Sequence, residues 1–210
     1  MKKNISLLLL VLISFAGYTQ SSYDISFNET ISLKKIEKST TFTILSDYGT
    51  VNLVGDAINH YKFKKPGIYL IKVIQKQEIF EEESEYPLLP AEIKVNVSRI
   101  KMKFDGSKLK LSEPIIKNSE TSGITISIPI TIETFDKKGV EMKYAAINSS
   151  GIGTSITATL KNEFKNLSPG KHLLVYELKG IITQNSYLMF DFIDANGKVQ
   201  SISLQSPIDN

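Results

Sequence analysis

The stretch of sequence that decides the fold class is 123–133, which reads Gly-Ile-Thr-Ile-Ser-Ile-Pro-Ile-Thr-Ile-Glu. Isoleucine occupies every second position, so all five isoleucines share one face of an extended strand. Thr, Ser and Pro129 share the other face. One apolar and one polar face are typical of an antiparallel sheet that buries a single side. Because proline donates no backbone hydrogen bond, we expect this strand to lie at a sheet edge or to bulge at Pro129.

The same alternation recurs after residue 20 and predicts further strands. They cover 41–45, 68–74, 92–97, 155–160, 173–178, 188–192 and 201–204, and another begins at Met102. Turn sequences that contain glycine separate them, at 47–49, 65–67, 136–139, 168–170 and 194–197. No stretch of ten or more residues shows the helical period. The sequence therefore predicts an all-β protein.

The first 19 residues have the pattern of a secretory signal peptide. Two lysines precede an apolar run over 5–16, and the small residues Gly17 and Thr19 then stand at positions −3 and −1 of a cleavage site. The run has about 12 residues, whereas a helix needs roughly 20 to cross a bilayer. We therefore expect residues 1–19 to be removed, which leaves an exported chain that begins at Gln20 and has no membrane insertion.

The composition excludes several classes of function. The chain has no cysteine, which excludes disulfides, thiolate metal sites and a cysteine nucleophile. The formal net charge is +3, and Arg99 is the only arginine, so we expect no nucleic-acid partner. His60 and His172 are the only histidines, and neither a G-x-S-x-G nor an H-E-x-x-H motif is present. We therefore predict a protein that is not an enzyme and that binds no cofactor.

One segment, 191–197, hints at a calcium loop. If Asp194, Asn196 and Gly197 take positions three, five and six of such a loop, Phe192 takes position one, where an oxygen ligand is required. A hairpin turn explains the aspartate and the glycine better. We expect no metal site here.

A weak internal repeat relates residues 61–73 to residues 164–176. Each segment has a strand, a Pro-Gly turn, an aromatic residue or histidine two positions after the glycine, and a second alternating strand. The repeat would mark one equivalent corner in each of two similar domains. We therefore expect two domains after the signal peptide of residues 1–19, with ranges 20–99 and 100–210.

The sequence 66–73, Pro-Gly-Ile-Tyr-Leu-Ile-Lys-Val, resembles the corner between strands E and F of immunoglobulin-like sandwiches. In that family a tyrosine near the start of strand F turns its hydroxyl back onto the corner backbone, and the resemblance gives this role to Tyr69. His172 stands at the equivalent place in the second unit. As a whole the chain resembles small secreted bacterial proteins built from two such domains. The implied fold is two tandem immunoglobulin-like antiparallel β-sandwich domains after a signal peptide.

The most unusual segment is the acidic stretch 78–90, which is longer than the usual hairpin loop. One interpretation is a solvated loop whose apolar residues fold back over the edge of the sandwich. The sharper interpretation is a loop that binds a partner. Its candidate contact residues are Ile79, Phe80, Glu81, Glu82, Glu83, Tyr86, Leu88 and Leu89.

These observations predict a non-enzymatic exported binding or assembly module of the cell envelope, with a protein or a surface polymer as its partner. Its place would be the periplasm, the cell surface or the extracellular space. The alternative is a periplasmic assembly chaperone of the pilus type. Ile93, Val95 and Val97 alternate on the last strand of domain one, where such chaperones donate a strand. That family also needs an arginine near the mature N-terminus, and this chain has none there.

Overall fold

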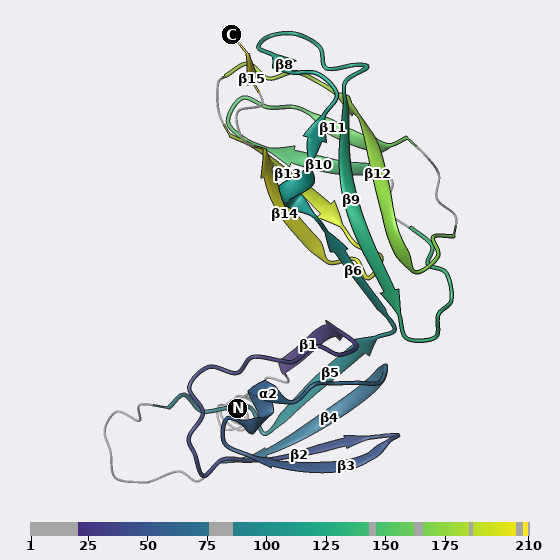
Figure 1. Cartoon of the computed structure of the whole chain (residues 1–210). Helices are drawn as coiled ribbons and strands as arrows, with labels where there is room; N and C mark the ends of the chain where they lie inside the picture. Colours follow the sequence, from purple (N-terminus) through teal and green to yellow (C-terminus); the bar gives the residue numbers. More distant parts are fainter. Residues whose placement is uncertain are drawn as a thin grey trace, which may run out of the picture. The chain divides into compact units, whose positions relative to one another are not determined.

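A computed structural model describes residues 21–75, 86–142, 146–161, 166–184, 187–204 and 208–209. The chain is all-β, as predicted, and it divides into two compact units, one ending at Val97 and one beginning at Ser98 (Figure 1). Within these ranges no helix has the length and apolar character needed to cross a membrane.

The first unit contains one continuous five-stranded sheet, in the order β1-β5-β4-β2-β3. The pairs β2–β3, β2–β4 and β4–β5 are antiparallel. The elements are β1 (Ser21–Ser26), β2 (Thr41–Ser46), β3 (Gly49–Val54), the short helix α2 (Ala57–His60), β4 (Gly67–Ile74) and β5 (Glu92–Ser98).

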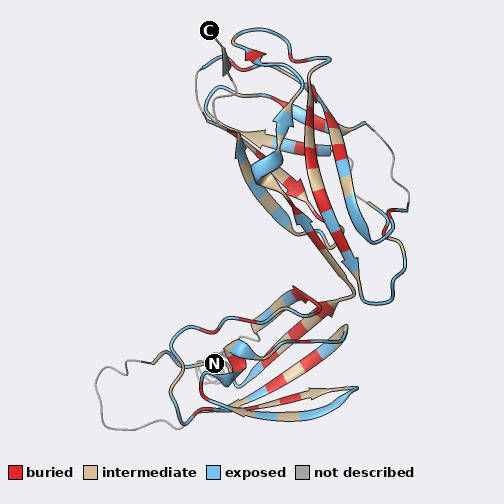
Figure 2. Ribbon diagram, viewed as in Figure 1, coloured by how far each residue is buried: buried red, intermediate tan, exposed pale blue. Residues whose placement is uncertain are grey.

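The core of the first unit lies on one face of this sheet. Phe42, Ile71 and Ile93, from three neighbouring strands, are fully buried. The layer opposite them comes from the segment between β1 and β2, from α2 and from the segment that follows it; it consists of Phe27, Ile31, Leu33, Ile58 and Phe63. Figure 2 shows buried and exposed positions alternating along β4. The alternating sequence pattern therefore sets which face of the sheet is buried.

Helix α2 has only four residues, too few for a periodic signal in the sequence. The side chain of Asn59 joins it to the covering segment. Its Oδ1 accepts a hydrogen bond from the backbone N–H of Leu33 at 2.7 Å, and its Nδ2 donates to the carbonyl of Leu33 at 3.1 Å. The helix is therefore positioned by tertiary contacts rather than by its own propensity.

The second unit contains an eight-stranded sheet in the order β14-β13-β10-β11-β12-β9-β6, with β7 also paired to β9, and a parallel pair β15–β8. The elements are β6 (Ile100–Phe104), η2 (Gly106–Lys108), β7 (Lys110–Leu111), β8 (Ile115–Ile116), β9 (Thr125–Thr134), β10 (Ala146–Ser150), β11 (Thr157–Leu160), β12 (Gly170–Lys179), β13 (Leu188–Ile193), β14 (Val199–Leu204) and β15 (Ile208–Asp209).

Strand β10 divides this sheet into two layers. Its first part pairs with β11, through Ala146 to Asn148, and its last two residues pair with β13. A strand that changes partners in this way turns a sheet back on itself. Between the layers, Tyr176 of β12 contacts Phe192 of β13 edge to face, with ring centroids 5.6 Å apart.

The isoleucine strand β9 lies in this core. Ile126, Ile128, Ile130 and Ile132 are all buried, as the alternation predicts (Figure 2). Ile124 precedes the strand and is half-buried.

Of the two alternatives expected at Pro129, the sheet edge is wrong, because β9 pairs with β12 on one side and with β6 and β7 on the other. Strand β9 does not bulge toward β12 either, since Pro129 stands in continuous register opposite Leu173. The pairing with β6 ends at Ile130, and the pairing with β7 resumes at Ser127. Between them the partner chain leaves the ladder through η2, and the N–H of Asp105 donates to the carbonyl of Pro129 at 2.8 Å. The missing N–H of Pro129 therefore faces a break in the neighbouring strand.

The two edge strands of the eight-stranded sheet are linked by side-chain amides. Gln200 of β14 donates to the carbonyl of Met102 and accepts from the N–H of Phe104, each at 3.4 Å. Nearby, Asn196 accepts from the hydroxyl of Ser98 at 2.6 Å and donates to the carbonyl of Ile100 at 3.0 Å. These bonds hold the β13–β14 hairpin against β6.

The segment weighed above as a calcium loop is the turn of that hairpin. The Oδ1 atom of Asp194 accepts from the N–H groups of Asn196 and Lys198 at 2.8 and 2.9 Å, and Gly197 has a φ of 81°. The aspartate therefore satisfies the turn's own donors. Within the described ranges, no group of three or more His, Asp or Glu side chains is placed to hold a metal ion.

Candidate functional site

The acidic segment 78–90 is described only from Tyr86 onward; the predicted contact residues Ile79, Phe80, Glu81, Glu82 and Glu83 lie outside the described residues. Tyr86 is half-buried, and Leu88 is 71% exposed. Leu89 packs against the core of the first unit.

The side chain of Gln75, at the end of β4, holds this end of the segment. It accepts from the N–H of Leu89 at 3.1 Å and donates to the carbonyl of Pro87 at 3.4 Å. Leu89 therefore behaves as expected for a loop whose apolar residues fold back onto the core. The side chain of Leu88 is exposed and could contact a partner.

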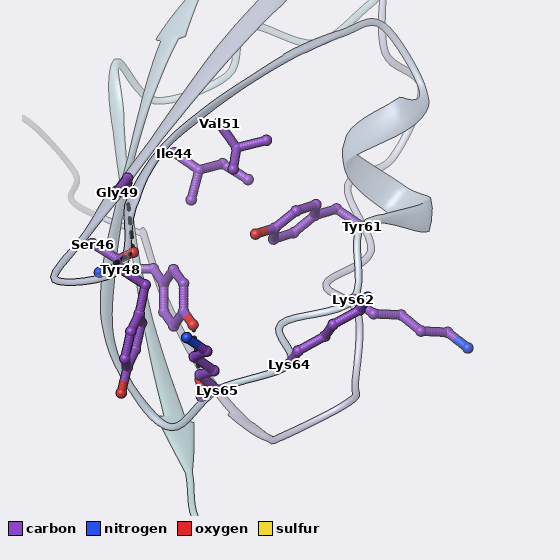
Figure 3. Close-up of a pocket in the computed structure, with 10 residues that line it drawn as sticks. Ile44, Ser46, Tyr48, Gly49, Val51, Tyr61, Lys62, Lys64 and Lys65 are labelled. Atoms are coloured by element: carbon purple, nitrogen blue, oxygen red, sulfur yellow. Dashed lines mark hydrogen bonds between the residues drawn. The ribbon is translucent and has the colours of Figure 1, made fainter.

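A pocket lies at the other end of β4. It has a volume of about 300 Å³ and is lined by Ile44, Ser46, Tyr48, Gly49, Val51, Tyr61, Lys62, Lys64, Lys65 and Tyr69 (Figure 3). We call it the tyrosine–lysine pocket. Three of its ten lining residues are tyrosines and three are lysines, whereas none is acidic.

Two tight turns and the segment after α2 build this pocket. The β2–β3 turn carries Tyr48, and the Pro-Gly turn before β4 carries Lys65. Gly49 and Gly67 adopt φ values of 116° and 142°, a backbone region that other residues rarely enter. Both turns lie at one end of the sheet, because Leu45 of β2 pairs with Leu70 of β4.

Two of the three tyrosines hold the Pro-Gly turn in place. The hydroxyl of Tyr69 donates to the carbonyl of Lys65 at 2.8 Å, which confirms the corner contact that the resemblance implies. The hydroxyl of Tyr48 donates to the next carbonyl, that of Pro66, at 2.9 Å. Burial, followed by the neighbouring Tyr61 and Tyr48, raises the pKa of Tyr69. Tyr69 therefore stays a donor at neutral pH.

The third tyrosine, Tyr61, offers its hydroxyl to the pocket. Its ring packs edge to face on Phe63, with centroids 4.9 Å apart, and Phe63 in turn packs edge to face on Tyr69 at 5.0 Å. Figure 3 shows the ring reaching across the pocket toward Ile44. Among the described residues the Tyr61 hydroxyl has no hydrogen-bond partner.

The lysines give the pocket a positive rim. The ammonium of Lys65 lies 4.5 Å from the centroid of the Tyr48 ring, within the range of a cation–π contact. Lys62, Lys64 and Lys65 are all exposed, and none forms an ion pair with a residue that the structure describes. In Figure 3 the side chain of Lys62 runs away from the tyrosine rings. Lys65 is thus the cation closest to the aromatic wall.

The two histidines take part in local structure. His60 pairs with Asp56 at 2.8 Å, on the exposed side of α2. His172 Nε2 lies 2.7 Å from the carbonyl of Ser168, four residues earlier, as Tyr69 lies four residues after Lys65. The internal repeat therefore corresponds to the same corner contact in both units, made by a phenol in one and by an imidazole in the other.

The strand proposed above for donation to a client is not an edge. Strand β5 lies between β1 and β4 in the sheet. Ile93, Val95 and Val97 are buried in the core of the first unit. This removes the observation on which the pilus-type chaperone rested.

The tyrosine–lysine pocket was not predicted from the sequence. Its lining comes from residues 44–69 and converges only when the β2–β3 turn meets the Pro-Gly turn. The available signal was the alternation Tyr61-Lys62-Phe63-Lys64, in which Phe63 is buried and both lysines are exposed.

No protein-family model matches this chain, and no curated protein is similar to it in sequence.

Proposed function

We propose that this protein is a non-enzymatic exported module of the cell envelope that binds a protein or a surface polymer. The observation that carries the proposal is the tyrosine–lysine pocket. It combines tyrosine rings with a phenol hydroxyl that has no hydrogen-bond partner among the described residues and with lysines that form no ion pair there. These groups suit recognition, since they can contact a ring, a hydroxyl group and an anion without any chemical step.

The lining holds groups for binding rather than for catalysis. Ser46 is the only side chain in it with an aliphatic hydroxyl, and that hydroxyl donates to the carbonyl of Gly49 at 3.3 Å. A serine nucleophile needs a base within hydrogen-bond reach, and the lining contains neither a histidine nor a carboxylate.

We further propose that both units are variants of the immunoglobulin-like sandwich, placed behind a cleaved signal peptide. The matching corners at Tyr69 and His172 and the partner change of β10 support this reading. Intact-mass measurement on envelope material tests the cleavage. The proposal expects a chain that begins at Gln20, and a retained segment 1–19 would contradict it.

Co-purification from the native envelope tests the binding function. The protein carries an affinity tag, and the captured material is compared with that of a variant in which Tyr61→Ala and Lys65→Gln are combined. A protein or polymer enriched by the wild type and lost in the variant supports a module that binds through the pocket. Capture of nothing by the folded wild type would refute the proposed function.

The alternative function is a pilus-type assembly chaperone. The same co-purification tests it, because such a chaperone would capture a fimbrial subunit. The buried positions of Ile93, Val95 and Val97 argue against it, because a donated strand must expose its alternating side chains to the client.

A further inference from the structure

We propose that the tyrosine–lysine pocket binds one uronic-acid unit of an acidic polysaccharide. The sugar ring lies against the tyrosine wall, and its carboxylate is paired with the ammonium of Lys65. The inference rests on the proposed binding function and names the chemistry of its ligand.

The ring-binding element is Tyr61. Its ring is fixed by the edge-to-face contact with Phe63, so little side-chain entropy is left to lose on binding. The face of an aromatic ring carries negative charge density, which attracts the C–H groups on the face of a sugar ring. Its hydroxyl, without a partner among the described residues, can pair with a sugar hydroxyl.

The anion-binding element is Lys65. The turn fixes its backbone, because the hydroxyls of Tyr69 and Tyr48 donate to the carbonyls of Lys65 and Pro66. The ammonium stands 4.5 Å from the Tyr48 ring centroid, beside the aromatic wall. A lysine binds as a compact point charge, which suits a single carboxylate in an open site. The lining contains no acidic residue that would compete with a ligand carboxylate for this ammonium.

The size of the pocket limits the ligand to one ring. Its volume of about 300 Å³ stands at the lower end of the range of roughly 300–1,000 Å³ for small-molecule sites. A polymer would therefore place one unit in the pocket and run on past the exposed rim, where Lys64 offers a second contact.

An acidic peptide is the rival ligand, and the structure favours it less. Peptides that add a strand to a sheet edge bind largely through main-chain hydrogen bonds. The two carbonyls of the Pro-Gly turn, Lys65 and Pro66, already accept from tyrosine hydroxyls. The groups left for a ligand are a phenol and ammonium groups, which match sugar hydroxyls and a carboxylate.

The test is calorimetric titration of the purified protein with short oligomers of galacturonate, mannuronate and glucuronate. Each oligomer is paired with its methyl ester, which keeps the ring and removes the charge, and oligoglutamate represents an acidic peptide. We expect at least one oligouronate to bind, and its methyl ester to bind at least tenfold more weakly.

Matched variants locate the site. Lys65→Gln should weaken oligouronate binding about tenfold, because a charge-assisted contact of roughly 1.4 kcal/mol is lost. Lys72→Gln removes the same charge from an exposed position of β4 outside the pocket lining, and it should change binding less than twofold. Tyr61→Ala should abolish measurable binding, while Tyr61→Phe, which keeps the ring and the packing on Phe63, should retain part of it. Circular dichroism shows whether each variant is folded.

Each remaining result overturns the inference. Equal losses in the two lysine variants would mean attraction by net charge alone, and tighter binding of oligoglutamate would mean a peptide site. Absence of binding to every oligouronate would refute the ligand class. If envelope capture were then still lost in the Tyr61→Ala and Lys65→Gln double variant, the proposed binding function would stand with a different ligand.

Discussion

Tyr69 and Lys65 are joined by a 2.8 Å hydrogen bond from the phenol hydroxyl to the backbone carbonyl four residues earlier. This bond ties the first residues of β4 to the turn that precedes the strand. Because the same turn carries the Lys65 ammonium to the tyrosine wall, a side chain of the core sets the geometry of the pocket rim. Tyr69 therefore has a structural role and a positioning role together.

The first prediction concerns this bond. Tyr69→Phe keeps the ring and should destabilise the first unit by about 1 kcal/mol, the usual net contribution of one hydrogen bond. Tyr69→Ala also opens a cavity beneath Phe63 and should cost on the order of 3–5 kcal/mol. Urea denaturation of both variants measures the difference. Unchanged midpoints in both would show that the corner contributes nothing to stability.

The second prediction is that the same substitution, tyrosine to phenylalanine, raises stability at Tyr176. Tyr176 is fully buried, and its hydroxyl has no hydrogen-bond partner among the described residues. Removing an unsatisfied buried donor relieves its desolvation cost, so Tyr176→Phe should stabilise the second unit by about 1 kcal/mol. The same urea experiment checks it, and Tyr69→Phe is the matched control. A loss of stability would mean that the hydroxyl has a partner outside the described ranges.

The third prediction follows from the pKa of the same residue. Burial raises the pKa of Tyr176 from 10.0 to about 12. The native state then holds this proton more tightly than the unfolded state, so stability is complete below pH 10 and falls as the pH rises toward 12. The shift corresponds to roughly 2–3 kcal/mol. Stability curves measured from pH 9 to pH 12 should show this decline in the wild type and a smaller one in Tyr176→Phe; parallel curves would contradict it.

A fourth prediction separates two adjacent leucines in the acidic segment. Leu89 packs on the core, so Leu89→Ala should destabilise the first unit by about 1–2 kcal/mol, less than a fully buried leucine would. Leu88 is 71% exposed, so Leu88→Ala should stay within about 0.5 kcal/mol of the wild type. Equal effects on thermal unfolding would mean that the two side chains do not differ in burial as described.

The fifth prediction tests the amide links between the edges of the second sheet. Asn196→Ala removes bonds of 2.6 and 3.0 Å and should cost about 1–2 kcal/mol. Gln200→Ala removes two longer bonds, both of 3.4 Å, and should cost less. The comparison is made by thermal unfolding. A larger loss in Gln200→Ala would reverse the assigned order of the two links.

The strands that could be predicted from the sequence are those that bury one face. The isoleucines of β9 and the alternating residues of β4 and β5 mark their faces by period alone. Strand β3 was not predicted. It lies at a sheet edge, and only its residues Val51 and Leu53 pack against the core, so its apolar alternation is short. Pro129 was misplaced because a break in the neighbouring strand, which only the folded chain reveals, accommodates its missing N–H.

The candidate site was harder to predict for a different physical reason. An acidic run such as 78–90 stands out in composition, whereas the pocket needs two turns and the segment after α2 to converge. Its tyrosines are common residues at unremarkable spacings. Tyr69 could be predicted because its contact is local, only four residues long. Tyr48 and Lys65 are in contact although 17 positions separate them in the chain, and no local sequence pattern predicts such a contact.

The pairing of first and last strands has a consequence for the order in which the chain can fold. Strand β1 lies beside β5, where Asn96 donates to Asp24 at 2.8 Å, so the first sheet is incomplete until its final strand has been synthesised. The bond between Ser98 and Asn196 spans nearly the whole second unit in the same way. Closing such long loops is entropically costly and slows folding. Each unit can therefore reach its native state only once its last strand is available, and the first unit can do so before the second.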